Sequence, residues 1–203
     1  MLRRPTPEQW NWYVAGVGLL KEFCSTNALQ APEVLAVGDP DWQVGACAYY
    51  RPGSPRPFIK ICVEHCAHIG RAGRSWSYPG WMIDRTPYGV LQHELGHHVD
   101  HSVKPYEHGW WGTWSAEVRV KTAEAPISGY GHNEDHEWFA EMFRLFVTNP
   151  HLMKKVRPET YREIHAVFTP VEHRPWEEVL AGAPERTQIL AHTRVYGATL
   201  SAQ

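Results

Sequence analysis

Residues 93–97 read His-Glu-Leu-Gly-His, and this short pattern constrains the chain more than any other segment. On a helix, residues four apart differ by about 40° around the axis, so the imidazoles of His93 and His97 leave the same face. Glu94 lies about 100° away and can reach a water beside a metal ion without being a ligand itself. The pattern therefore predicts a helix that holds a zinc ion.

The motif needs support from the rest of the chain, because 13 of the 203 residues are His. A solvated, His-rich helix face would give the same letters. Gly96 costs a helix interior about 1 kcal/mol relative to Ala, so we expect another element to pack closely against this turn. His98 and His101 should leave the helix on other faces and are expected to be bystanders.

A catalytic zinc site needs a third protein ligand and an open coordination position. One layout places a third His six residues after the second, but Val103 stands there. Another layout takes a Glu from a separate downstream helix, and the predicted helix 134–148 offers Glu137 and Glu141 on one face. The apolar residues around them predict that this helix is buried, and buried carboxylates need a partner. A metal with its histidines would be one partner, and surface salt bridges to Arg144 or Lys154 would be the alternative.

Together, the two segments resemble the catalytic domain of anthrax lethal factor-type zinc metallopeptidases. Residues 93–100, His-Glu-Leu-Gly-His-His-Val-Asp, resemble the zinc helix of that family. Residues 130–145, from Tyr-Gly through Glu-Trp-Phe-Ala-Glu-Met-Phe-Arg-Leu, resemble its second helix and the segment before it. The gap between the helices is also similar, and the likeness extends over residues 86–147. It implies a gluzincin-like zincin fold.

The resemblance also implies a role for each matching residue. His93, His97 and Glu137 would bind one catalytic Zn²⁺ ion, with Glu94 as the general base. The resemblance further gives Tyr130 as a donor to the developing oxyanion. Glu141 would accept a hydrogen bond from a ligand His ring.

Three further polar residues stand near these motifs. Asp100 lies one turn beyond His97 and would either orient a ligand ring or simply lie on the helix surface. His132 and His136 flank the second segment, and either could assist the chemistry. The expected reading for both is a loop or helix-surface residue.

The order of predicted elements indicates an α+β fold. We expect one zincin-like domain over residues 1–203, with a helix and a small mixed sheet in 1–82 and a mainly helical portion in 83–203 that carries the active-site helices. The predicted helices are 7–25, 88–101, 115–123, 134–148 and 158–168, with further helical segments in 175–196. The predicted strands are 33–37, 43–50 and 58–64.

Composition excludes some partners and compartments. The formal net charge is −2 with both signs mixed along the chain, so no nucleic-acid partner is expected. No segment has the roughly 20 apolar residues of a membrane span, and no signal peptide is recognisable, so we expect a cytoplasmic protein without a membrane partner. Export by another route or assembly into a larger particle stays open, as does the oligomeric state.

The four cysteines fit that compartment as buried thiols. Cys62 and Cys66, with His65 and His68, could also be imagined as a second metal site. Their spacing fits none of the common zinc patterns, and no second pair of ligands stands nearby. A strand that ends in a turn is the simpler interpretation.

The expected function is a zinc-dependent endopeptidase that acts on a peptide or protein substrate. One alternative is a non-catalytic zinc-containing binding or structural module, although such a module has no need of Glu94. Another is a deformylase-like amidase with Cys47 as a ligand. The sequence pattern of that family around its Cys is missing, and Glu137 would have no role.

Overall fold

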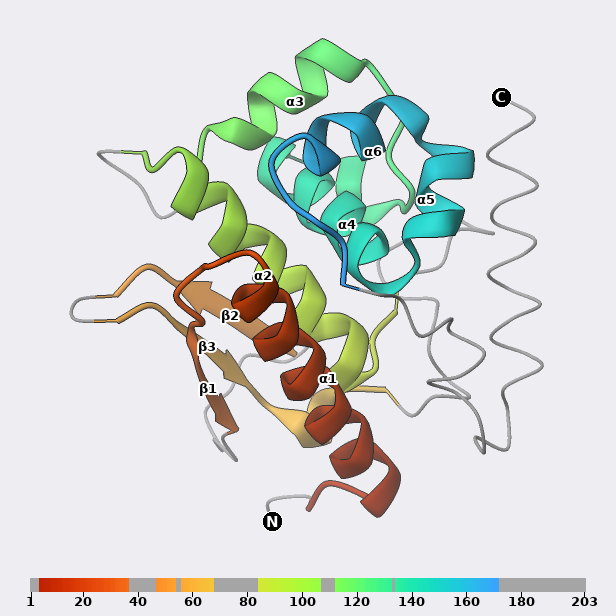
Figure 1. The fold of residues 1–203 in the computed structure, drawn as a ribbon. Helices are drawn as coiled ribbons and strands as arrows, with labels where there is room; N and C mark the ends of the chain where they lie inside the picture. The colour runs from red at the N-terminus through yellow and green to blue at the C-terminus, as the bar shows by residue number, and fades with distance from the viewer. Residues whose placement is uncertain are drawn as a thin grey trace.

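The computed structural model describes residues 4–36, 47–53, 56–67, 84–106, 112–132 and 134–171. The predictions for residues 37 and 43–46, for His68 and for the helical segments in 175–196 lie outside them. Within the described residues, the fold is α+β, with a small mixed sheet and a mostly helical remainder (Figure 1). This confirms the predicted fold class. No helix in the described part of the chain is long and apolar enough to cross a membrane.

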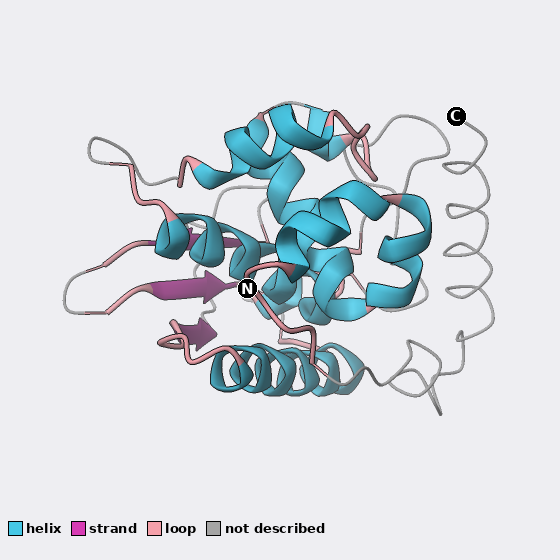
Figure 2. Cartoon of the chain, turned by 45° about the horizontal axis from the view of Figure 1, so that its top comes forward, coloured by secondary structure: helices cyan, strands magenta, loops and turns pink. Residues whose placement is uncertain are grey.

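The sheet has three short strands, which Figure 2 shows gathered on one side of the helices. Their order is β1-β3-β2, where β1 is Glu33–Ala36, β2 is Ala48–Arg51 and β3 is Phe58–Ile61. β3 pairs in parallel with β1 and antiparallel with β2. Alternate residues of β3 are buried, as expected for a strand with one face on the core.

The predicted strand over 58–64 is too long at its C-terminal end. The Cys62 carbonyl accepts a hydrogen bond from the His65 N–H at 3.0 Å, which closes a turn. Residues Val63–His65 form the 3-10 helix η1 in place of a strand end.

Helix α1 (Pro7–Thr26) begins at a capping box, as its sequence predicts. The Thr6 side chain accepts from the Gln9 N–H, and the Gln9 side chain accepts from the Thr6 N–H. Gln9 also donates from Nε2 to the Cys66 carbonyl at 2.6 Å, which ties the start of α1 to the segment after the sheet.

Helix α2 (Pro87–Val103) is the central element of the described structure. It runs behind α1 in Figure 1, with the sheet on one side and helix α4 on the other. Every residue from Pro87 to Asp100 is buried except His93, which is half-buried. Over this stretch of the helix, solvent therefore reaches mainly the first histidine of the motif.

Helix α4 (Asp135–Thr148) packs against α2 and α3 (Trp114–Thr122), and a short 3-10 helix, η3 (Tyr130–His132), lies against it. Its apolar side chains join those of α1 in one core, with Phe23 and Phe143 edge to face at 5.2 Å between ring centroids. The predicted burial of this helix is confirmed.

Helices α5 (Pro150–Val156) and α6 (Pro158–His165) follow α4 directly. The sequence predicts no helix over residues 150–156, because Asn149-Pro150 is also typical of a helix end. The Asn149 side chain accepts from the Leu152 N–H, and Pro150 is the first helical residue, so the same two residues also start α5.

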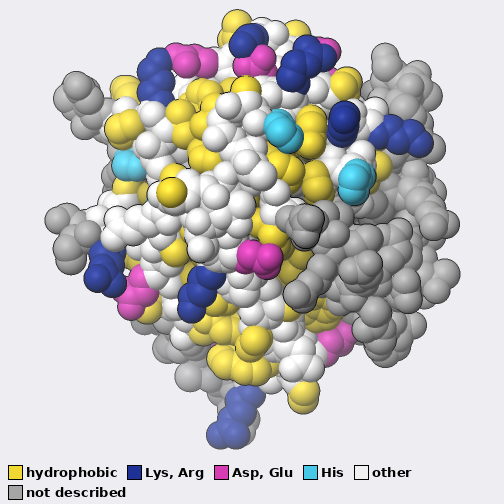
Figure 3. Space-filling model, in the orientation of Figure 1, with side chains coloured by type: hydrophobic (Ala, Val, Ile, Leu, Met, Phe, Trp, Pro, Cys, Tyr) yellow, Lys and Arg dark blue, Asp and Glu magenta, His cyan; other side chains and the backbone are white. Residues whose placement is uncertain are grey.

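Charged residues of both signs are mixed over the upper edge of the face drawn in Figure 3, where α3 and α6 lie. Lys121 of α3 pairs with Glu163 of α6 at 2.6 Å, and Arg162 pairs with Glu159 within α6. These are exposed pairs, each worth less than about 1 kcal/mol.

Helices α2 and α4 come closest at Gly96. A Cβ atom added to Gly96 would lie 2.7 Å from the Ala140 Cα and 3.2 Å from the Phe143 Cβ. The missing side chain therefore lets the two backbones approach, as Gly96 in the motif predicts. This approach sets the distance between the histidines of α2 and the carboxylates of α4.

Gly96→Ala is expected to destabilise the protein, because the added methyl group must push α4 away from α2. Overpacking of this kind costs about 1–3 kcal/mol, which outweighs the gain of up to about 1 kcal/mol in helix propensity. The measurement is the free energy of unfolding of the metal-free protein in urea. Gly18→Ala on α1 is the matched control, since its Cβ meets no atom within 4 Å and should stabilise slightly. Equal stability of the two variants would contradict this packing account.

Candidate metal centre

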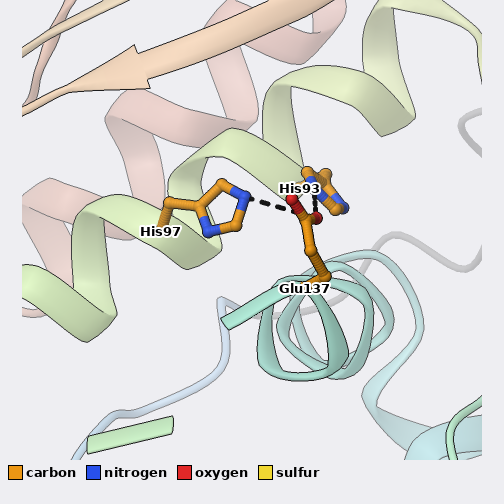
Figure 4. Close-up of side chains that lie close together, drawn as sticks. All are labelled: His93, His97 and Glu137. Carbon is orange, nitrogen blue, oxygen red and sulfur yellow. Dashed lines mark hydrogen bonds and ion pairs between the residues drawn. The ribbon is translucent and has the colours of Figure 1, made fainter. Parts of the chain in front are cut away.

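Three side chains from two helices converge on one point (Figure 4). The Nε2 atoms of His93 and His97, both on α2, lie 3.0 Å and 3.6 Å from Oε2 of Glu137 on α4. One ligand atom from each residue falls within 4.8 Å of the others. Within the described ranges, no other set of three or more His, Cys, Asp or Glu side chains is arranged so that it could hold a metal ion.

Both ring nitrogens of His93 face carboxylate oxygens. Nε2 lies 3.0 Å from Glu137 Oε2, and Nδ1 lies 2.9 Å from Glu141 Oε1. A neutral imidazole has only one N–H, so one of these contacts would set a nitrogen lone pair against a carboxylate. The arrangement is favourable only when a proton or a metal ion lies on the second nitrogen. Two imidazoles and one carboxylate are a ligand set that zinc takes in catalytic sites, so the residues fit this metal.

The charges of the site shift the pKa values of its members in opposite directions. Burial lowers the pKa of His93, but the hydrogen bonds and charges of Glu137 and Glu141 outweigh it and raise the value to about 10. Burial raises the pKa of each glutamate, yet His93 and His97 hold that of Glu137 well below its usual range. Arg144 and His93 do the same for Glu141. The carboxylates of Glu137 and Glu141 therefore stay ionised and favour a positive charge on the histidine between them.

Glu94 is buried beside this group, with 7% of its surface exposed. Burial raises the pKa of Glu94 above its usual value, against the charges of His97 and His93, which lower it. A hydrogen bond from the backbone of Tyr50, in strand β2, also lowers it and connects Glu94 to the sheet. A carboxylate whose pKa is raised by burial is a better proton acceptor than an exposed one.

Tyr130 is the first residue of η3 and lies beside α2 and α4. Its ring centroid lies 5.7 Å from that of His93, and its hydroxyl hydrogen-bonds to Glu137. Burial, together with the charges of Glu137 and Glu94, raises the pKa of Tyr130, so the hydroxyl keeps its proton. The sequence predicts only a loop between Pro126 and Asn133, and within it the 3-10 helix η3 brings Tyr130 to the site.

Glu141 is buried and touches His93 Nδ1 at 2.9 Å, which is the contact that the sequence resemblance implies for it. Its other partner is Arg144, which is buried as well. The salt bridge to Arg144 considered from the sequence therefore forms, but its expected surface position is wrong, because both side chains are buried. Sequence analysis missed the burial of Arg144, although its place among the apolar residues of α4 indicates it.

Asp100 is buried one turn beyond His97, with 1% of its surface exposed. Its Oδ1 accepts a hydrogen bond from the Ser115 N–H at 2.7 Å, at the start of α3. Burial raises the pKa of Asp100, and the charge of His97 is among the effects that lower it. Asp100 thus joins α2 to α3, and its action on the His97 ring stays a prediction.

The other histidines differ in how close they lie to the site. The ring centroid of His136 lies 5.6 Å from that of His97, and its Nε2 lies 3.7 Å from Glu137 Oε1. His132 is exposed. His98 is buried away from the ligand atoms, with its Nε2 2.9 Å from the Gln30 carbonyl. His136 therefore lies close to the ligand pair, which its expected surface position did not indicate.

The cysteines do not take part in this group. Cys62 and Cys66 are buried and His65 is exposed, and the described residues form no three-ligand set there. The Cys47 thiol accepts a hydrogen bond from Arg85 Nη2 at 3.2 Å. The ligand set of a deformylase-like site, which would need Cys47 beside His93 and His97, is thus not formed.

Comparisons with family models, with curated proteins and with solved structures gave no match for this chain. The chemistry of the centre has to be inferred from its own residues.

The raised pKa of His93 predicts how the stability of the metal-free protein changes with pH. The protonated ring stabilises the folded state fully below its unfolded-state pKa of about 6.5, and this contribution is lost as the pH rises through about 10. The stability advantage of the wild type over His93→Gln should therefore shrink between those pH values. The measurement is urea unfolding of both proteins across that range, and a constant difference would contradict the predicted shift.

Proposed function

We propose that this chain is a zinc-dependent endopeptidase with a zincin-like active site. The observation that carries the proposal is the meeting of His93, His97 and Glu137 at one point, with Glu94 and Tyr130 beside it. These are the parts that metal-assisted hydrolysis needs: two neutral nitrogen ligands, one carboxylate ligand, a base and a hydrogen-bond donor.

His93, His97 and Glu137 would hold the zinc ion. When bound, the ion supplies Lewis acidity, which polarises a carbonyl and lowers the pKa of water to the neighbourhood of 7. Three protein ligands leave one position open, which separates a catalytic site from a purely structural one.

Glu94 would move the proton. A carboxylate oxygen of Glu94 takes the proton from the attacking water and passes it to the nitrogen of the leaving amine. The Tyr130 hydroxyl, which keeps its proton in this environment, would donate a hydrogen bond to the developing oxyanion of the peptide. One such donor is typically worth a few kcal/mol in the transition state.

The first test separates zinc binding from hydrolysis. Glu94→Gln is expected to keep the fold and the zinc but to lose hydrolysis of a peptide library, because it removes only the proton acceptor. His93→Ala and Glu137→Ala are expected to lose the zinc, because each removes a ligand. The measurements are metal analysis of the purified proteins and mass spectrometry of the digested library.

His165→Ala is the matched control for loss of a histidine, since His165 is exposed on α6, and it should keep both properties. Absence of zinc from the wild-type protein at neutral pH would overturn the proposal. Zinc binding without hydrolysis of any peptide would favour the non-catalytic zinc module instead.

Tyr130→Phe is expected to lower kcat by about 10²–10³, the usual effect of removing one oxyanion donor. It should weaken zinc binding far less than the loss of a ligand does, because Tyr130 hydrogen-bonds to Glu137 but is not itself a ligand. Steady-state kinetics on a cleaved peptide measure the first effect, and chelator competition measures the second. A variant with wild-type kcat would remove Tyr130 from the mechanism.

A further inference from the structure

Arg144 is a buried arginine directly behind the metal centre. Its Nε donates to Glu141 Oε1 at 3.1 Å, and its Nη2 donates to Glu141 Oε2 at 2.9 Å. Glu141 Oε1 is also the oxygen that faces His93 Nδ1 at 2.9 Å. One carboxylate oxygen therefore connects the guanidinium of Arg144 to a candidate metal ligand.

A buried ion pair needs a reason, because removing two charges from water costs several kcal/mol per ion. Arg162 and Glu159 on α6 make the same kind of pair three residues apart, but both side chains are exposed. The side chains of Arg144 and Glu141 are only 8% and 3% exposed. Stability alone would be served as well by apolar residues at these two positions of α4.

Arg144 also acts on a second carboxylate, that of Asp84. Asp84 lies just before α2, where its Oδ1 accepts hydrogen bonds from the Thr86 N–H and the Thr86 hydroxyl. Burial raises the pKa of Asp84, and the positive charge of Arg144 lowers it. Charges therefore alternate from Asp84 through Arg144 to Glu141 and His93.

The direction of each hydrogen bond follows from this arrangement. Arg144 has only donors, so both Glu141 oxygens accept from it, and the carboxylate cannot rotate without losing one of these bonds. With Oε1 held in place, His93 donates from Nδ1, which leaves Nε2, the nitrogen that faces Glu137, for the second proton in the metal-free protein or for a metal ion. A ring with its proton on Nδ1 and a free Nε2 is the tautomer that a metal ligand needs.

We propose that Arg144 is a positioning residue for the metal centre: by its fork of two hydrogen bonds it fixes the Glu141 carboxylate, which fixes the ring of His93. This inference rests on the proposed function, because it takes His93 as a metal ligand. Arg144 reaches His93 through Glu141, the carboxylate that it holds by two hydrogen bonds.

The first experiment measures zinc affinity by chelator competition in the full-length protein. Arg144→Met keeps most of the side-chain length and removes the charge, and it should raise the Kd for zinc about tenfold or more, as loss of an outer-shell partner does. Arg144→Lys keeps the charge but loses the fork, so its Kd should lie between those of Arg144→Met and the wild type.

The matched control is Arg157→Met. Arg157 is also buried, but it donates to the backbone carbonyls of Ala125, Val156 and Pro126 and makes no contact with Glu141. Its loss should lower the stability of the fold and leave the Kd for zinc unchanged. Should Arg144→Met fail to fold, the double variant Asp84→Asn/Arg144→Met removes both opposite charges and is measured in its place.

A spectroscopic readout separates positioning from general stability. Long-range ¹H–¹⁵N NMR of the zinc-loaded protein is expected to show a protonated, slowly exchanging Nδ1 on His93 in the wild type and in Arg157→Met. In Arg144→Met this signal should broaden or be lost, because the ring is no longer held.

The outcomes for the two proposals differ. A wild-type protein that binds no zinc would overturn the proposed function and this inference together. A wild-type protein that binds zinc, with an unchanged Kd and His93 signal in Arg144→Met, would overturn this inference and leave the proposed function intact.

Discussion

The close contact of α2 with α4 is the constraint on which the rest of the site depends. Gly96 has no side chain, and the Cα of Ala140 occupies the space where one would lie. His93, three residues before Gly96, meets Glu137 and Glu141 of α4, and His97, the residue after Gly96, meets Glu137. Gly96 therefore belongs to the site as much as its polar neighbours do, since the spacing of the helices sets every distance between the candidate ligands.

Charge balance is the second organising feature. Four largely buried ionisable side chains form a chain of contacts, in which Glu137 meets His93, His93 meets Glu141 and Glu141 meets Arg144. Both nitrogens of the His93 ring face carboxylates, so the centre is stable only with a cation at its middle. In the metal-free protein a proton can fill this role, and zinc would compete with that proton. Folding and metal binding thus use the same charges.

Much of this could be predicted from the sequence, because it depends on local patterns. Helical spacing gave the ranges of α1, α2 and α4, and Gly96 predicted a close neighbour. Asn149-Pro150 was read as a stop only, since a cap that both ends one helix and starts another looks the same in sequence. The place of His136 beside the ligand pair could not be predicted, because it depends on which helix faces meet in three dimensions.

The central claim is that two histidines of α2 and one glutamate of α4 bind zinc. X-ray absorption spectroscopy at the zinc edge of the purified protein tests this most directly, because it reports the ligand atoms themselves. The expected ligands are two imidazoles and carboxylate or water oxygens at about 2.0–2.2 Å from the zinc. A sulfur ligand at about 2.3 Å, which would mean that a cysteine binds the metal, or a protein that retains no zinc, would contradict it.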